Sequence, residues 1–99
     1  MKIKNQAFFV EIENKYTHQF YKGFLIDAED RDSVTQTVIS VCNIDPLSFD
    51  IKISEISNEK ANNFFEDKLP NGDPKYKVID EQVGIFEMVY SSIGNPYED

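Results

Sequence analysis

Residues 6–13 read Gln6-Ala7-Phe8-Phe9-Val10-Glu11-Ile12-Glu13, and this stretch decides the fold. The apolar positions 8, 10 and 12 fall on one side of an extended chain, while positions 9, 11 and 13 fall on the other. A period of two is typical of a strand with one buried face. We therefore predict a strand over residues 7–13, with Glu11 and Glu13 on its exposed face.

Two further stretches repeat this alternation. Phe20, Phe24 and Ile26 predict a strand over residues 20–26, and the polar residues 14–17 before it predict a hairpin turn. Within that strand, Gly23 marks a bulge or a close backbone approach. The third stretch has apolar residues at 49, 51 and 53, alternating with polar ones, and predicts a strand over residues 49–55.

Two segments indicate helices. Residues 27–33 (Asp27-Ala-Glu-Asp-Arg-Asp-Ser33) place capping residues and carboxylates ahead of apolar residues with helical spacing, namely Val34, Val38, Val41 and Cys42. A strand is the alternative there, because β-branched residues lower helix propensity. Ser57-Asn58 caps a second predicted helix over residues 59–69, with Ala61, Phe64 and Phe65 on its apolar face.

These elements define an α+β fold of one small domain over residues 1–99. Residues 70–74 form a turn, and strand candidates follow around Tyr76 and over residues 84–90. We predict a mainly antiparallel sheet of four to five strands with two helices on one face, in the order β-β-α-β-α-β-β. Residues 94–99 are predicted to be a loose acidic tail.

The residues offer little for catalysis. The chain has one Cys and one His, so a zinc site of the usual kind is not expected. Cys42 is predicted to be a buried, inert thiol, although a Cys42–His18 dyad is an alternative. The acids from Asp27 to Asp32 fail the spacing of a calcium-binding EF-hand loop. We predict no enzymatic activity, no metal and no cofactor. A small hydrolase or a metal-dependent nuclease built on Asp27 to Asp32 is a third hypothesis.

Charge is the most informative property. The formal net charge is −8, which disfavours direct binding to nucleic acid and to anionic membrane. Residues 1–26 carry a net charge of +2, whereas residues 27–58 carry −5. An uneven distribution of this kind can steer a basic partner at long range. No apolar run is long enough to span a bilayer, and Met1-Lys2-Ile3-Lys4 lacks a secretory apolar segment, so we expect a cytoplasmic protein.

Residues 7–58 resemble the N-terminal module of ArdA-type antirestriction proteins. The resemblance rests on Phe8-Phe9-Val10, Tyr16 in a polar turn, the run from Gly23 to Asp27, an acidic capped helix and a strand ending near Glu55. It implies a module that imitates the charge of DNA and occupies the DNA-binding groove of a restriction enzyme. The matched acids that would stand for phosphates are Asp27, Glu29, Asp30 and Asp32.

We therefore predict a non-enzymatic acidic inhibitor, such as a phage or mobile-element anti-defence protein, that blocks a basic nucleic-acid-binding groove of a host defence protein. The predicted contacts are Asp27, Glu29, Asp30, Asp32, Asp50, Glu55, Tyr16 and Tyr21. This hypothesis requires carboxylates concentrated on one face. The alternative is a generic interaction or self-assembly module that pairs through a sheet face or edge, for example as a homodimer, with Phe9, Tyr21 and Tyr90 on an open sheet face.

Overall fold

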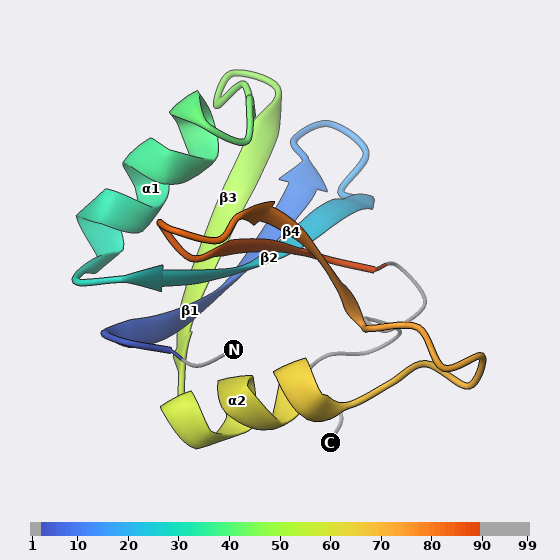
Figure 1. Cartoon of the computed structure of the whole chain (residues 1–99). Helices are drawn as coiled ribbons and strands as arrows, with labels where there is room; N and C mark the ends of the chain where they lie inside the picture. Colours follow the sequence, from blue (N-terminus) through green and yellow to red (C-terminus); the bar gives the residue numbers. More distant parts are fainter. Residues whose placement is uncertain (1–2, 90–99) are drawn as a thin grey trace.

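The strand predicted first is one of the inner strands of the sheet. In the computed structural model, which describes residues 3–89, five strands form one antiparallel sheet in the order β3-β1-β2-β5-β4 (Figure 1). The predicted α+β fold and the order β-β-α-β-α-β-β are confirmed. The elements are β1 Gln6–Asn14, β2 Phe20–Ala28, α1 Arg31–Ser40, β3 Phe49–Ile56, α2 Asn58–Glu66, β4 Tyr76–Asp80 and β5 Ile85–Met88.

The register of β1 determines which side chains share a face. Residues paired directly across antiparallel strands lie on the same side, so Phe8 shares its face with its partner on β2, Ile26. Pairing of β1 with β2 is regular as far as Ile12 and Lys22 and then shifts, leaving Tyr21 without a partner opposite. The bulge therefore lies at Tyr21 and not at Gly23, which pairs regularly with Glu11; of the two alternatives given for Gly23, the bulge is wrong.

Helix α1 covers one face of the sheet. Its buried residues Val34 and Val38 pack on the even-numbered residues of β1. The full core on this face comprises Phe8, Val10, Ile12, Phe24, Ile26, Val34, Val38, Ile44 and Ile85. A helix therefore forms despite its β-branched residues, because the apolar contacts with the sheet outweigh the low propensity. The alternative of a strand in this segment is wrong.

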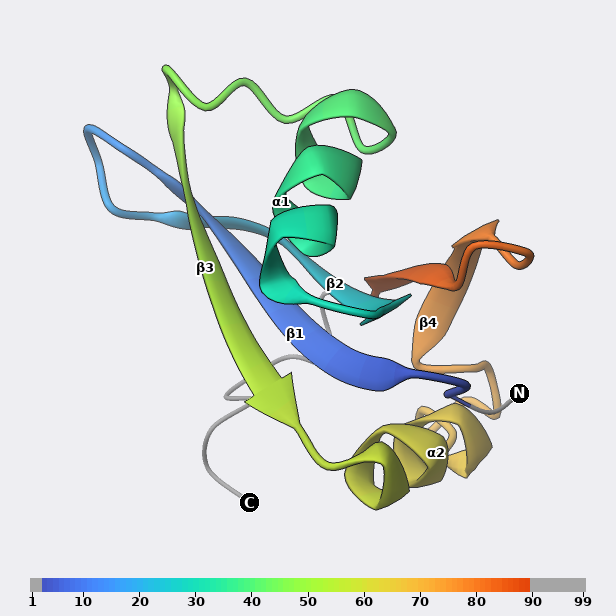
Figure 2. The same ribbon diagram turned by 90° about the vertical axis from the view of Figure 1, so that its left-hand side faces the viewer.

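Helix α2 covers the opposite face. Ala61 and Phe65 pack with Ala7, Leu25 and Phe86, whose side chains point away from α1. Figures 1 and 2 show the two helices on either side of the central strands. The prediction that both helices share one face is therefore wrong.

The second face is not an open surface either. Phe9 is only 5% exposed and packs with Met88, so the prediction that it lies on an open sheet face is wrong. The reason is that β1 and β2 are apolar on both faces, which requires cover on both sides. Tyr90 and the predicted acidic tail lie outside the described residues. Within residues 3–89, no helix combines the length and apolar character needed to cross a bilayer.

Candidate functional site

Asp27 is a structural residue of β2 and does not begin a helix. It is 9% exposed, and its carboxylate accepts hydrogen bonds from the backbone N–H groups of Lys4 at 2.8 Å and Asn5 at 3.0 Å. Its own N–H donates to the Gly84 carbonyl at 2.8 Å. Asp27 thus joins the N-terminal segment to the turn between β4 and β5. Both carboxylate oxygens are engaged, which removes Asp27 from the exposed acidic surface predicted from the sequence.

The N-cap of α1 lies three residues later than Asp27, the first predicted capping residue. Asp30 is the N-cap, and its carboxylate accepts the backbone N–H of Ser33 at 2.8 Å. This hydrogen bond, followed by one from the Ser33 hydroxyl, lowers the pKa of Asp30. The N-cap carboxylate is therefore held ionised in a fixed position.

Three exposed carboxylates lie within four residues at the start of α1, and a fourth lies on β3, the strand that the start of the helix contacts. The Arg31 guanidinium donates to the carbonyl of Ile53 on β3 at 2.7 Å, which ties the start of the helix to that strand. Two residues further along β3, Glu55 faces the α1 side because it pairs with Phe8. We call the four acids the α1 patch, and its members are Glu29, Asp30, Asp32 and Glu55.

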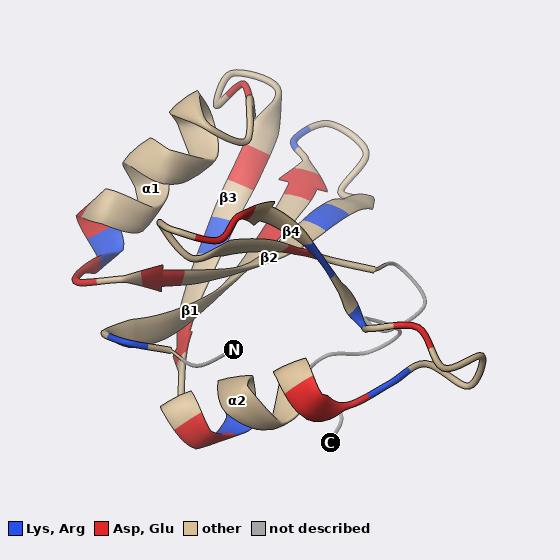
Figure 3. Cartoon of the chain, viewed as in Figure 1, with Lys and Arg blue, Asp and Glu red and all other residues tan. Residues whose placement is uncertain are grey.

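Asp50 does not belong to the α1 patch. It lies five residues before Glu55 on β3, a separation of about 17 Å along an extended strand. An odd spacing also places the two side chains on opposite faces. Figure 3 shows Asp and Glu on both helices and on several strands. The carboxylates predicted from the sequence therefore do not form one continuous face.

The two predicted tyrosine contacts lie at the other end of β1. Tyr16 is 78% exposed in the turn between β1 and β2. The Tyr21 ring is half exposed and stacks on Phe49 with 4.8 Å between centroids, while the Lys22 ammonium lies 5.4 Å from the same ring. Neither tyrosine adjoins the α1 patch.

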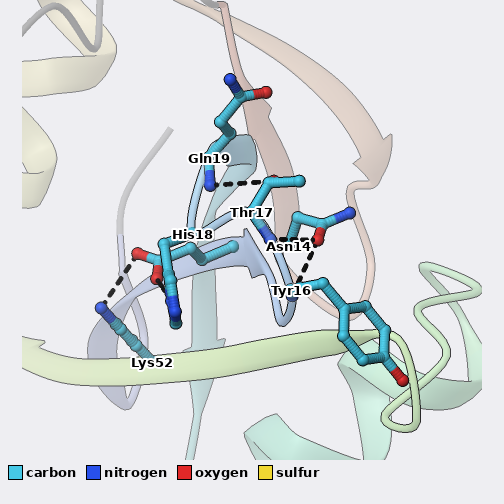
Figure 4. Close-up of polar contacts among 7 residues, drawn as sticks. Asn14, Tyr16, Thr17, His18, Gln19 and Lys52 are labelled. Carbon is cyan, nitrogen blue, oxygen red and sulfur yellow. Dashed lines mark hydrogen bonds and ion pairs between the residues drawn. The ribbon is translucent and has the colours of Figure 1, made fainter.

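A polar cluster that sequence reasoning missed lies beside this turn. Glu13, His18 and Asp50 come from β1, the turn and β3, and one ligand atom of each lies within 4.8 Å of the other two. Glu13 Oε1 is 3.3 Å from His18 Nδ1, and its other oxygen is 3.0 Å from Lys52 Nζ (Figure 4). The Glu13 side chain is only 14% exposed, so it is not the fully exposed carboxylate predicted.

The turn directs His18 towards Glu13. The Asn14 side-chain oxygen accepts the N–H groups of Tyr16 and Thr17, each at 2.9 Å (Figure 4). His18 has a φ of 59° and donates its N–H to the Asn14 carbonyl at 2.8 Å. A left-handed conformation is uncommon outside glycine, and the sequence of the turn does not indicate that His18 adopts it.

Electrostatics reinforces the contact between Glu13 and Lys52. The hydrogen bond from Lys52 lowers the pKa of Glu13, and the same contact raises the pKa of Lys52. Both groups therefore stay charged at neutral pH. Lys52 holds one Glu13 oxygen and leaves the other directed at the imidazole.

Cys42 is less buried than the sequence predicted, and its inertness stays a prediction. It is half-buried against the α1 face of the sheet, and burial raises its pKa to about 11. His18 contacts Glu13, whose side chain lies on the opposite face. The structure therefore does not bring together the Cys42–His18 dyad that the sequence left open.

Comparison of the chain with protein families, with curated proteins and with solved structures gave no match. The resemblance to ArdA-type proteins stays a prediction.

Proposed function

We propose that this chain is a non-enzymatic protein-binding domain that presents the α1 patch to a basic protein surface. The observation that carries the proposal is the exposure of three carboxylates at the start of α1 and of Glu55 on β3, the strand that the Arg31 guanidinium contacts at the Ile53 carbonyl. Asp30 is fixed as the N-cap of α1, so part of the patch is rigid before binding. Preorganised charges lower the entropy lost on association and increase the rate of encounter.

The class of partner follows from the sign and size of the patch. A cluster of carboxylates complements Lys- and Arg-rich surfaces, and proteins that process nucleic acid have such grooves. The proposed action is inhibition, in which the domain occupies the groove of a host defence protein in the cytoplasm, as a phage or mobile-element protein would. DNA carries one charge per ~1.7 Å of axis. Four carboxylates therefore replace a short phosphate segment, which favours a local contact over mimicry along the whole molecule.

The test compares two triple variants with equal changes of net charge. The patch variant combines Glu29→Gln, Asp32→Asn and Glu55→Gln, and it retains Asp30 because that residue caps α1. The control variant combines Glu66→Gln, Asp73→Asn and Glu81→Gln, three exposed acids at the end of α2, in the loop after it and in the turn between β4 and β5. Each protein is immobilised and exposed to bacterial proteins previously eluted from a DNA column.

The expected result is capture by the wild type and the control, release by added duplex DNA, and loss of capture by the patch variant. Capture should weaken as salt rises, because exposed charges are screened beyond ~10 Å at 0.1 M ionic strength. Equal capture by both triple variants would contradict the proposal, as would capture that duplex DNA does not displace.

Self-pairing through a sheet edge is the second candidate function. Among the described strands, β3 is an edge strand of eight residues, long enough to pair with a second copy. Arg31 already occupies one of its carbonyls, and Asp50, Lys52 and Glu55 place charges along it. Charged residues on an edge are a common protection against pairing. Sedimentation at high concentration decides this point, since a dimer that dissociates on mutation of β3 would favour self-assembly.

A further inference from the structure

The cluster beside the β1–β2 turn has the composition of a metal site. We propose that Glu13, His18 and Asp50 bind a divalent transition-metal ion such as Zn²⁺ or Co²⁺. The ligand atoms come from three separate segments and already lie within 4.8 Å of one another. One imidazole nitrogen with two carboxylate oxygens suits these borderline cations. Water supplies the remaining position of a four-coordinate site.

The spacing of the first two ligands matches such an ion. With bonds of about 2.0–2.1 Å, two ligand atoms on a tetrahedral Zn²⁺ are separated by roughly 3.3–3.4 Å. His18 Nδ1 and Glu13 Oε1 are 3.3 Å apart. One Asp50 carboxylate oxygen lies within 4.8 Å of a ligand atom of each of the other two residues, so binding of an ion would draw Asp50 closer to them.

The charge around the cluster leaves room for a cation. Glu13 and Asp50 pair directly across β1 and β3, and like charges in this arrangement destabilise a sheet. Glu11 pairs across from Lys52 in the same register. One ammonium therefore faces three carboxylates, and a divalent ion would offset the excess negative charge.

Lys52 has a positioning role in this proposal. Its ammonium holds Glu13 Oε2 at 3.0 Å, which turns Oε1 towards His18. Contacts of this kind orient metal-binding carboxylates in known sites. The His18 side chain is 72% exposed, so an ion reaches the site directly from solvent.

The experiment uses the full chain without a histidine tag. Co²⁺ is titrated into the protein and followed by visible absorption, Zn²⁺ is then used to displace it, and the His18 imidazole is followed by NMR. Assignment is simple because His18 is the only histidine. We expect one ion per chain, a shift of the imidazole signals, and at least about tenfold weaker binding in His18→Gln and in Asp50→Asn. Glu66→Gln, an exposed acid on α2, is the matched control and should bind as the wild type.

Two results would overturn the proposal. The first is an unchanged affinity in both His18→Gln and Asp50→Asn, which would indicate adventitious binding to surface carboxylates. The second is wild-type protein whose imidazole signals do not shift with Zn²⁺ or Co²⁺ up to 1 mM. That measurement needs no variant, and it tests the site even if Asp50→Asn fails to fold.

Discussion

Replacing Asp27 by alanine should destabilise the domain by about 3 kcal/mol. The carboxylate accepts two backbone N–H groups, from Lys4 and Asn5, that lie more than 20 residues away in the chain. Hydrogen bonds to a charged group contribute ~1.5–3 kcal/mol each. The lower value applies here because both donor residues are exposed and their N–H groups can bind water after the substitution.

The size of this effect separates a structural role from a binding role. Small domains unfold with a free energy of only ~5–15 kcal/mol, so Asp27→Ala should shift the urea midpoint strongly. Asp27→Asn keeps one acceptor oxygen and should lose about half as much. Asp32→Asn, an exposed acid of the α1 patch, should change the free energy of unfolding by less than ~0.5 kcal/mol.

The assay is urea unfolding with the slope checked for each variant, together with amide hydrogen exchange. In Asp27→Ala the amides of Lys4 and Asn5 should exchange faster than in the wild type. A loss below about 1 kcal/mol, or unchanged exchange at both amides, would refute the reasoning. Retained partner capture by Asp27→Asn, alongside reduced stability, would exclude Asp27 as a phosphate surrogate.

Three further predictions concern single residues. Gly84→Ala should lower the free energy of unfolding in urea by about 2–4 kcal/mol, because φ is 90° and a Cβ would lie 2.7 Å from the Cβ of Asp27. Gly72→Ala is the control: φ is 92° but the space around it is open, so the free energy of unfolding should fall by only about 1 kcal/mol. Asp30 has a lowered pKa in the folded protein, so its stabilising effect is present at neutral pH and is lost as pH falls through that pKa. In urea unfolding, acidification should therefore lower the free energy of unfolding less in Asp30→Asn than in the wild type. Cys42, with its pKa raised to about 11, should react with iodoacetamide at pH 8 at least about tenfold more slowly in folded than in urea-unfolded protein, and equal rates would contradict its burial.

The sheet could be predicted because its signal is local. Alternation of period two in residues 7–13, 20–26 and 49–55 is sufficient to place three strands, and each lies within its observed strand. The placement of the helices could not be predicted in the same way. Phe9 and Leu25 make the second face of the two central strands apolar, and only burial shows that this face is covered by α2.

The residue at which α1 begins could not be predicted from the sequence, for a different reason. Asp27, Asp30 and Ser33 are all residue types that cap helices, so the sequence offers several starting points within seven residues. The pairing of β2 with β1 extends to Ala28 and decides between them. Asp27 is therefore a residue of the sheet, and its carboxylate accepts hydrogen bonds from backbone N–H groups that are distant in sequence.

The Glu13–His18–Asp50 cluster could not be predicted because it depends on tertiary register. Glu13 and Asp50 are 37 residues apart and become neighbours only when β1 pairs with β3. Counting His and Cys alone also misses carboxylate ligands. A histidine five residues after an acid across a predicted turn was the one local signal that could have indicated it.

The two proposed sites can be tested independently because they lie near opposite ends of β3 and on opposite faces of it. Glu55 of the α1 patch and Asp50 of the polar cluster lie about 17 Å apart along the strand and on opposite faces. Substitutions at sites more than ~7–10 Å apart, with no shared partners, usually have additive effects. Asp50→Asn should therefore weaken metal binding without changing partner capture, and Glu55→Gln should do the reverse. If Asp50→Asn also abolished capture, the patch would extend along β3 and the acidic surface would be larger than the four carboxylates of the α1 patch.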